Sequence, residues 1–409
     1  MPTLSEKAKL MPSSPIRKLV PFAEGAKKRG IKVFHLNIGQ PDLATPPLFF
    51  EAINKAKLET LEYSHSAGIE SYRRKLATYY QKFSLSVDYT NILITTGGSE
   101  ALRFVFMACL NAGDEVIVPE PLYANYIGFA VEAGIKIVPI TTDISKGYAL
   151  PNAETFEKLI TPKTKAIMIC NPSNPTGKLM PLSELEALRD IVKEKNLYLF
   201  ADEVYKEFCY DGETFYSTLN LKGIEENVVV IDSVSKRYSA CGARIGCLIS
   251  RNKELINSIL KFAQARLSPP TLGQVGAEAL CELPQSYFDG VTKEYVARRD
   301  VVIKALSQME GVICPKASGA FYLMPQFPID NSDRFCQWLL EEFNYKNTTV
   351  MMAPGTGFYA TPGMGLQQAR IAYVLDCEEL TQAMECLKVA LQQYFNKIKT
   401  HTKELITSI

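Results

Sequence analysis

The chain has 409 residues and carries 45 Lys and Arg against 44 Asp and Glu, so its formal net charge at pH 7 is +1. A balance so close to zero excludes a protein that holds nucleic acid or an anionic membrane by charge alone, while 47% hydrophobic and 22% charged residues are typical of a folded chain. Because no apolar run is long enough for a membrane-spanning helix and residues 1–15 lack the apolar core of a signal peptide, we expect a cytoplasmic protein.

Predicted strands and helices alternate through the middle of the chain. A Pro-punctuated N-terminal segment, with a strand at 33–38, comes first. Short β-branched runs then predict seven strands, at 91–95, 115–119, 136–139, 165–170, 197–201, 228–232 and 246–250. Amphipathic stretches between them predict helices at 99–110, 123–132, 153–159 and 182–194. This alternation implies an α/β fold with a mostly parallel sheet between two layers of helices, and ligands at the carboxyl ends of its strands.

The C-terminal part of the chain has a different pattern. A long polar helix is predicted at 285–308, strands at 320–324, 349–353 and 370–374, and a last helix at 377–398. We expect these elements to join the N-terminal segment in a smaller α+β domain built from both chain ends. The predicted domains are an N-terminal segment at 1–45, a large cofactor-binding domain at 46–290 and a small domain at 291–409.

The ten cysteines and three histidines limit the possible chemistry. Most of the cysteines stand in apolar runs and no CxxC occurs, which is typical of small buried side chains in a reduced protein without a metal site. With so few histidines, Ser-His-Asp or Cys-His hydrolysis is disfavoured, because an imidazole must stand beside the nucleophile.

One lysine follows the predicted strand that ends at Asp232. Lys236 should therefore lie at the carboxyl end of that strand, in an apolar cleft that lowers the pKa of its amine and makes it nucleophilic. Ser233, Arg244 and nearby glycines are the groups that bind a phosphate dianion. A lysine that can form an imine beside a phosphate site suggests pyridoxal phosphate.

Three more motifs follow predicted strands. Asp202 ends a strand and can pair with a pyridinium N–H, with Tyr205 in reach of a ring oxygen. Asn174 stands in a loop of two Asn-Pro units. Gly98 and Ser99 begin a helix and present backbone N–H groups to an anion. Each motif alone is typical of an ordinary turn or cap, but their order along alternating strands favours a cofactor site.

Together these motifs resemble the class I/II pyridoxal-phosphate aminotransferases of the aspartate aminotransferase superfamily, fold type I. The family's lysine signature has a serine three residues before the lysine and an arginine eight residues after it, followed by Ile-Gly. It is matched here by Ser233, Lys236, Arg244, Ile245 and Gly246. Further similar segments surround Gly39, Tyr63, Tyr123 and Arg370.

The resemblance implies that Lys236 binds the cofactor as a Schiff base and then acts as general acid and base at the substrate carbon. It implies three further sets of residues: Tyr123, Asn174, Asp202 and Tyr205 around the cofactor ring; Gly98, Ser99, Ser233 and Arg244 around its phosphate, with Tyr63 from the second subunit of a homodimer; and Gly39, Asn174 and Arg370 around the substrate. Asp202 and Tyr205 would act with Lys236 in catalysis.

The implied reaction moves an α-amino group between an L-amino acid and a 2-oxoacid. Glutamate with 2-oxoglutarate is the expected first pair, and aspartate or another amino acid supplies the second. Some aspartate-type relatives carry a basic residue at the position of Ser99, so strict aspartate specificity does not follow. Arg17 and Arg266 are the candidate cations for a distal carboxylate.

Other functions remain open at this point. A pyridoxal-phosphate lyase or cyclising synthase would share Lys236. A Ser-x-x-Lys hydrolase would use Ser233 and Lys236, but its Lys-Thr-Gly partner motif is missing. A pyridoxal-phosphate sensor fused to a DNA-binding module would need a helix-turn-helix segment, for which neither chain end has room.

Overall fold

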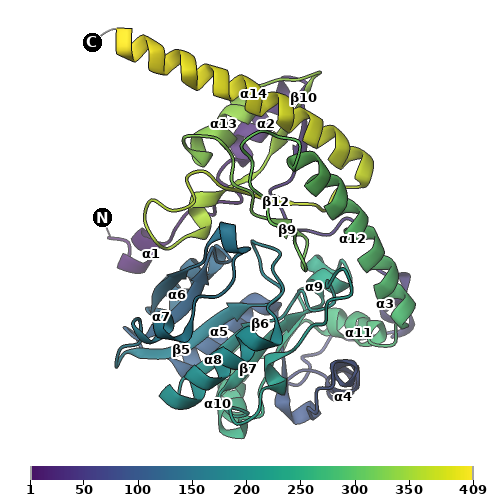
Figure 1. Cartoon of the computed structure of the whole chain (residues 1–409). Coiled ribbons are helices and arrows are strands. Elements are labelled where there is room, and N and C mark those ends of the chain that lie inside the picture. The colour runs from purple at the N-terminus through teal and green to yellow at the C-terminus, as the bar shows by residue number, and fades with distance from the viewer. Residues whose placement is uncertain (1, 408–409) are drawn as a thin grey trace.

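The structure, a computed structural model, describes residues 2–407, and the side chains of these up to residue 397. It has two parts (Figure 1). The larger part contains a central sheet with helices on both faces, and the smaller part contains segments from both ends of the chain. The helix that carries Lys236, α9 (Val234–Arg237), lies where the two parts meet.

The large part is built on a seven-stranded sheet in the order β2-β8-β7-β6-β5-β3-β4. The strands are β2 (Ile92–Thr95), β3 (Glu115–Glu120), β4 (Lys136–Thr141), β5 (Thr164–Cys170), β6 (Tyr198–Asp202), β7 (Val228–Ser233) and β8 (Gly246–Ile249). β8 runs antiparallel to both of its neighbours, and the other neighbouring pairs are parallel. The predicted seven-stranded, mostly parallel sheet is confirmed.

Alternate residues of the strands enter two separate hydrophobic cores. Phe200 faces the core beneath α5 (Gly98–Cys109), α6 (Asn125–Ala133) and α10 (Lys253–Ala265). Its neighbours Leu199 and Ala201 face the opposite core, beneath α4 (Glu70–Tyr80), α8 (Leu182–Lys195) and α11 (Thr271–Leu280). The period of two along a strand places helices on both faces of the sheet. Apolar strand residues are buried on both faces, and the polar residues that follow them gather at one edge.

The small part brings the two chain ends together. β1 (Lys32–His35) pairs in parallel with β10 (Thr348–Met351), and β11 (Ala353–Pro354), β12 (Ala369–Ala372) and β9 (Tyr322–Leu323) form an antiparallel sheet. The helices of this part are α2 (Val20–Lys28), α12 (Gln285–Leu306), α13 (Ser332–Glu341) and α14 (Cys377–Thr407). α12 runs across residue 290, so a single continuous helix joins the two parts.

The six predicted helices are all present as α5, α6, α7 (Ala153–Glu157), α8, α12 and α14. Eight helices were not predicted: α1 (Glu6–Leu10), α2, α3 (Pro47–Lys55), α4, α9, α10, α11 and α13. α11 shows why, since Gly273 and Gly276 lower its helix propensity. A Cβ on Gly276 would lie 2.5 Å from the Phe49 ring of α3, so this glycine is required by the close packing of two helices. Short 3-10 turns occur at Gln81–Phe83, Tyr89–Asn91, Ile144–Lys146, Thr218–Asn220, Cys241–Ala243 and Gly355–Phe358.

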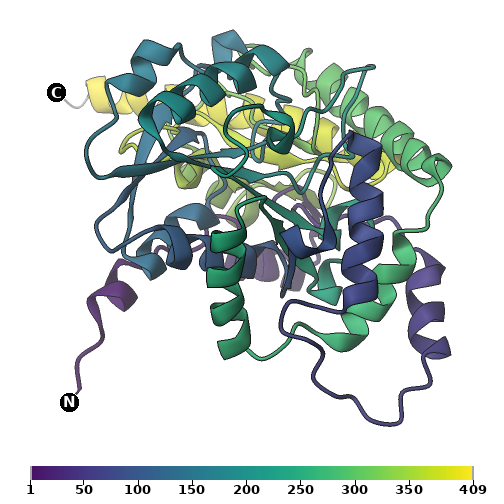
Figure 2. The ribbon, with the colours of Figure 1, turned by 90° about the horizontal axis from the view of Figure 1, so that it is seen from below.

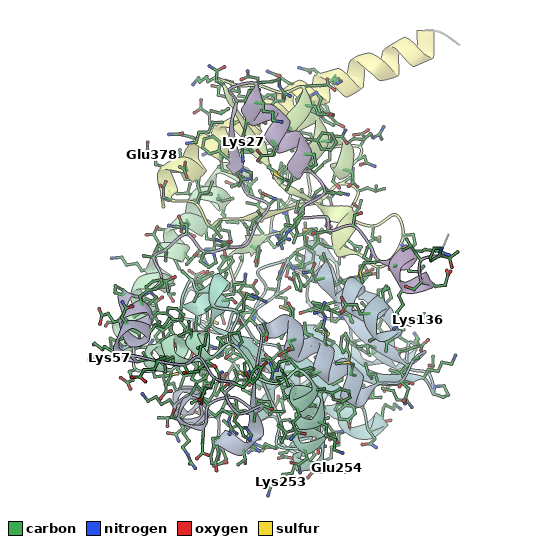
Figure 3. All side chains as sticks on the ribbon, turned by 180° about the vertical axis from the view of Figure 1, so that it is seen from behind. Lys27, Lys57, Lys136, Lys253, Glu254 and Glu378 are labelled. Carbon is green, nitrogen blue, oxygen red and sulfur yellow. The ribbon has the colours of Figure 1, made fainter. Side chains whose placement is uncertain are left out.

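The surface carries charges of both signs side by side. Lys253 and Glu254 lie next to each other at the end of the large part, and Lys27 and Glu378 both lie on the small part (Figure 3). Within the described residues, no helix is long and apolar enough to cross a membrane.

Candidate active site

The register of the sheet gathers the predicted site residues at one edge. Thr95 of β2 and Ser233 of β7 both lie opposite Gly246 of β8. Cys170 of β5 lies opposite Asp202 of β6. The carboxyl ends of β2, β5, β6 and β7 and the amino end of the antiparallel β8 therefore lie at one edge of the sheet, where ligands bind in α/β folds.

Two glycines let the phosphate-binding candidates come together. Gly97 precedes α5 with φ +75, and a Cβ there would lie 2.5 Å from a guanidinium nitrogen of Arg244. A Cβ on Gly246 would lie 2.7 Å from the backbone nitrogen of Gly98. Ser233 caps α9 and donates from its hydroxyl to the carbonyl of Ile245 over 3.0 Å. A guanidinium, a hydroxyl and the start of α5, which includes Ser99, thus lie close together, an arrangement of donors that suits an anion.

Lys236 links this edge to the N-terminal segment. Its Nζ donates to the carbonyl of Gly39 over 2.7 Å. Burial lowers the pKa of the Lys236 amine, and the nearby positive charges of Arg370 and Arg244 lower it further. A larger share of the amine is therefore neutral than in an exposed lysine, which suits a nucleophile and a proton carrier.

Asp202 is buried at the end of β6. Its Oδ2 accepts a hydrogen bond of 2.8 Å from the Tyr126 hydroxyl, and burial raises the pKa of the Asp202 carboxyl to about 6. The Tyr126 ring meets the Tyr123 ring edge to face, with centroids 5.2 Å apart. Tyr123 accepts a hydrogen bond of 2.7 Å from the Asn125 side chain. This arrangement holds the two rings beside a carboxyl group that gains from a cationic partner.

Arg370 is the most deeply buried cation of the site, with a relative exposure of 1%. It donates to Oδ1 of Asn174 over 2.9 Å and to the carbonyl of Asn37 over 2.6 Å. Its Nε is buried and, within the described part of the chain, has no hydrogen-bond partner. Since a guanidinium has five N–H donors, Arg370 keeps unused donors for a carboxylate.

Tyr205 and Tyr322 meet between these groups. Their hydroxyl oxygens are 2.8 Å apart, and the Arg370 guanidinium carbon lies 4.5 Å from the centroid of the Tyr322 ring. A Cβ on Gly39 would overlap the Tyr322 hydroxyl, so glycine is required there. Three predicted site residues, Gly39, Tyr205 and Arg370, therefore contact one aromatic side chain, Tyr322, that the motifs did not identify.

A buried ionic cluster lies behind the lysine. Asp232 accepts from the backbone N–H of Ser233 over 2.7 Å and pairs with Arg237 and with Lys206, the latter over 2.6 Å. Arg237 also contacts Glu207 over 2.7 Å. Burial alone would raise the pKa of Asp232, but Arg237 and Lys206 lower it below its usual value. Through the pair of Asp232 with Arg237, the cluster links the end of β7, before Lys236, to the residue that follows Lys236.

Two residues named in the sequence analysis, Tyr63 and Arg266, do not lie free at this site. Tyr63, with a relative exposure of 79%, stands in the long loop between α3 and α4 that extends from the body of the chain (Figure 2). It forms no described hydrogen bond to the residues above. Arg266 is not a free cation: it pairs with Glu100 over 2.5 Å, which corrects its proposed role in substrate recognition. Arg17 is exposed in the N-terminal segment.

Sequence analysis did not identify Asn37, Tyr126 or Tyr322. Tyr322 lies in a strand that was predicted, but no spacing signal marks which strand residue turns toward the site. Tyr123 lies two residues before α6 and Tyr126 lies in its first turn, three residues further along the chain, so a helical projection of the predicted helix 123–132 would have placed the two on one face.

Known proteins show the same architecture. The family described as "Aminotransferase class I and II" matches residues 31–387. An aspartate aminotransferase of Pyrococcus horikoshii is 31% identical over 395 residues, which are 95% of this chain and 97% of the relative. An aspartate/prephenate aminotransferase of Thermus thermophilus is 32% identical over 367 residues, covering 88% of this chain and 91% of the relative.

Solved structures agree with these relatives. The aspartate aminotransferase of Thermotoga maritima superposes with a TM-score of 0.87 at 30% identity, over 95% of this chain and all of that structure. The aspartate aminotransferase of Thermus thermophilus with maleate gives a TM-score of 0.86 at 29% identity and the same coverage. The match extends over both parts of the fold and over every strand that carries a candidate site residue, so the chain belongs to the class I and II aminotransferases and is an aminotransferase of fold type I.

Proposed function

We propose that the chain binds pyridoxal 5′-phosphate through Lys236 and moves an α-amino group between an L-amino acid and a 2-oxoacid in a ping-pong cycle. Class I and II aminotransferases use this cofactor. The observation that carries the proposal is the buried Lys236 amine, with its lowered pKa, at the strand edge that also presents Asp202 and Arg244.

The residues at this edge fit the charged features of the cofactor. A phosphate dianion suits Ser233, Arg244 and the N–H groups of Gly98 and Ser99 at the start of α5. A protonated ring nitrogen suits Asp202, because pairing with a cation offsets the cost of burying the carboxylate.

The remaining polar and aromatic groups fit the cofactor ring. Asn174 and Tyr205 are proposed to donate hydrogen bonds to the ring oxygen, and Tyr123 is proposed to cover the ring face. When bound, pyridoxal phosphate supplies an electrophilic aldehyde carbon and a ring that accepts electron density from the substrate.

Lys236 is proposed to move the proton. Its amine removes the proton from the α-carbon of the amino acid and returns a proton during the second half-reaction. The lowered pKa keeps part of the amine neutral, as a base requires, and the Gly39 carbonyl accepts one of its hydrogens. Asp202 favours this step by stabilising positive charge at the ring nitrogen.

Arg370 is proposed to bind the substrate α-carboxylate. Its unpartnered Nε and the remaining N–H groups of its guanidinium can form a two-bond fork that an ammonium cannot reproduce. Gly39 and Asn174 would complete the substrate site, because Asn174 holds Arg370 and Gly39 leaves room above Tyr322.

For the substrates, we propose glutamate with 2-oxoglutarate as one pair and aspartate as the first candidate for the other. Relatives with aspartate in their names support this choice. A panel of donors with 2-oxoglutarate as acceptor tests it. Ser99→Lys should raise the rate with aspartate relative to alanine and aromatic donors by supplying a distal cation, and Ser99→Ala is the control. Unchanged donor ratios would place the distal carboxylate away from Ser99, and turnover without an acceptor would indicate the lyase alternative.

We also propose a homodimer with shared sites. The loop between α3 and α4 exposes Leu58, Leu61 and Tyr63. Two further leucines are exposed, Leu267 between α10 and α11 and Leu272 in the first turn of α11. Large exposed apolar side chains that gather on a loop are typical of a subunit interface. The family resemblance assigns Tyr63 to the phosphate of the neighbouring subunit. The expected compartment is the cytoplasm, where the ten cysteines, none in a disulfide, would stay reduced.

The cofactor proposal is tested by borohydride reduction of the purified protein followed by peptide mapping. The adduct should lie on Lys236, and the other lysines serve as internal controls. An adduct on any other lysine would falsify the assignment. Lys236→Ala should lose turnover by at least about 10²–10⁴-fold, the usual contribution of a general acid/base.

The shared site is tested by mixing two impaired variants. Lys236→Ala chains and Tyr63→Phe chains should form heterodimers that contain one intact site and regain activity. Sedimentation of the wild-type protein gives the oligomeric state. A monomer, or no recovery after subunit exchange, contradicts the shared site.

A further inference from the structure

Tyr322 stands between two groups that the proposed function uses separately. On one side its hydroxyl meets the Tyr205 hydroxyl over 2.8 Å. On the other side its ring packs under the Arg370 guanidinium, 4.5 Å from centroid to carbon. Its own position is restricted, since it is almost fully buried in β9 and leaves no space for a side chain on Gly39.

The direction of the Tyr205–Tyr322 hydrogen bond depends on whether the Tyr205 hydroxyl has a third partner. Burial raises the pKa of both hydroxyls, so both keep their protons at neutral pH. Within the described part of the chain, Tyr205 is the one hydrogen-bond partner of the Tyr322 hydroxyl. Either hydroxyl can donate in this hydrogen bond. When Tyr205 donates its proton to a third group, its oxygen is left to accept from Tyr322, because a buried hydroxyl without another acceptor donates to the partner it has.

We propose that Tyr322 is a positioning residue that acts through Tyr205, and this inference rests on the proposed function. By occupying the acceptor position of Tyr205, Tyr322 directs the Tyr205 proton to the cofactor ring oxygen. A chain of two hydrogen bonds polarises the donor at its end and strengthens that bond. The Tyr322 ring meanwhile supports Arg370, so one side chain fixes the spacing between the ring-oxygen donor and the carboxylate-binding guanidinium.

This arrangement has a spectroscopic consequence. A donor to the ring oxygen withdraws negative charge from it and so lowers the pKa of the protonated nitrogen that joins the cofactor to the lysine. Without the Tyr322 hydroxyl, the Tyr205 O–H loses the hydrogen bond that polarises it, so its bond to the ring oxygen weakens and that pKa should rise. The visible absorption band of the cofactor reports this ionisation without any turnover.

The test titrates the absorption band of the holoenzyme with pH. Tyr322→Phe should raise the midpoint by about 0.5 pH unit, the scale expected when one bond of a chain is lost. Tyr205→Phe should raise it more, and the double variant should match Tyr205→Phe because Tyr322 acts through Tyr205. Tyr373→Phe is the control: it removes another buried tyrosine hydroxyl, which donates to the Ala320 carbonyl over 3.1 Å, and should leave the midpoint unchanged.

Kinetics separate the two roles of the side chain. Tyr322→Phe keeps the ring under Arg370, so KM for the amino acid should stay within about twofold while kcat falls. Tyr322→Leu removes the ring face and should raise KM as well, because the cation loses its aromatic partner.

An unchanged midpoint in Tyr322→Phe, or an equal shift in Tyr373→Phe, overturns the inference. A wild-type protein without a pH-dependent visible band would instead count against the proposed cofactor, so the two failures are distinguishable.

Discussion

Replacing Asp202 with Asn should stabilise the cofactor-free protein at neutral pH. Burial raises the pKa of Asp202 from 3.8 to about 6, so the folded protein pays to ionise this carboxyl above pH 6, whereas the unfolded chain ionises it freely. The shift is about 2 pH units, and each unit corresponds to about 1.4 kcal/mol, so the free energy of unfolding is reduced by about 3 kcal/mol at pH 7 to 8.

The sign of the effect fixes its pH dependence. A carboxyl whose folded pKa is raised contributes its stability below pH 3.8 and loses it as the pH rises through 6. Asn stays neutral throughout and can still accept the Tyr126 hydrogen bond. The advantage of Asp202→Asn should therefore grow between about pH 4 and 6 and then level off.

Urea unfolding followed by circular dichroism, at one protein concentration and at several pH values, measures this advantage. Asp211→Asn is the control, because hydrogen bonds from Arg299 and Lys316 lower the pKa of Asp211 to about 2. That variant should lose stability, by an amount that stays constant between pH 5 and 8. If Asp202→Asn is no more stable than the wild type at pH 8, or if its advantage does not change with pH, the reasoning is refuted.

Three further predictions address the groups around the lysine. Arg237→Met removes the cation between the carboxylates of Asp232 and Glu207 and should lower the free energy of unfolding in urea at pH 7 by about 3–5 kcal/mol. Arg334→Met, at an exposed ion pair, is the control and should change it by no more than about 0.5 kcal/mol. Similar losses in both variants would contradict the buried cluster. Gly97→Ala places a Cβ 2.5 Å from a guanidinium nitrogen of Arg244 and should weaken cofactor binding at least about tenfold in equilibrium dialysis, a change of about 1.4 kcal/mol. Gly113→Ala is the control: Gly113 also has a positive φ but open space around it, so this variant should bind the cofactor as the wild type does. Arg370→Lys should lower kcat/KM for aspartate, alanine and aromatic donors alike by about 10- to 100-fold, and a spared donor class would argue against a shared carboxylate site.

The strands and the lysine site could be predicted because their signals are local. β5, β6 and β7 are short apolar runs bounded by turn residues, and their alternation with amphipathic helices determines the sheet. Lys236, Ser233 and Arg244 lie within one segment of twelve residues, from Ser233 to Arg244, so one segment of sequence contains most of the proposed phosphate site.

The remaining features depend on contacts between distant segments. Tyr322 reaches Tyr205 because β9 of the small part lies against the loop after β6, and no periodicity in either segment encodes that approach. Gly276 weakens the helical pattern of α11, yet it is the residue that Phe49 requires. Arg266 has the positive charge that a substrate carboxylate would need, but in the folded chain it pairs with Glu100, which is distant in the sequence.

The joining of both chain ends in the small part has a consequence for biosynthesis. Asn37 and Arg370 are separated by 333 positions in the sequence, and β1 finds its partner β10 only after residue 351 has been made. A nascent chain on the ribosome can complete the seven-stranded sheet while its first strand still has an unpaired edge. The proposed carboxylate site is therefore assembled at the end of translation, and a protein truncated before β12 would keep Lys236 and the proposed phosphate site but lack the arginine proposed to bind the substrate carboxylate.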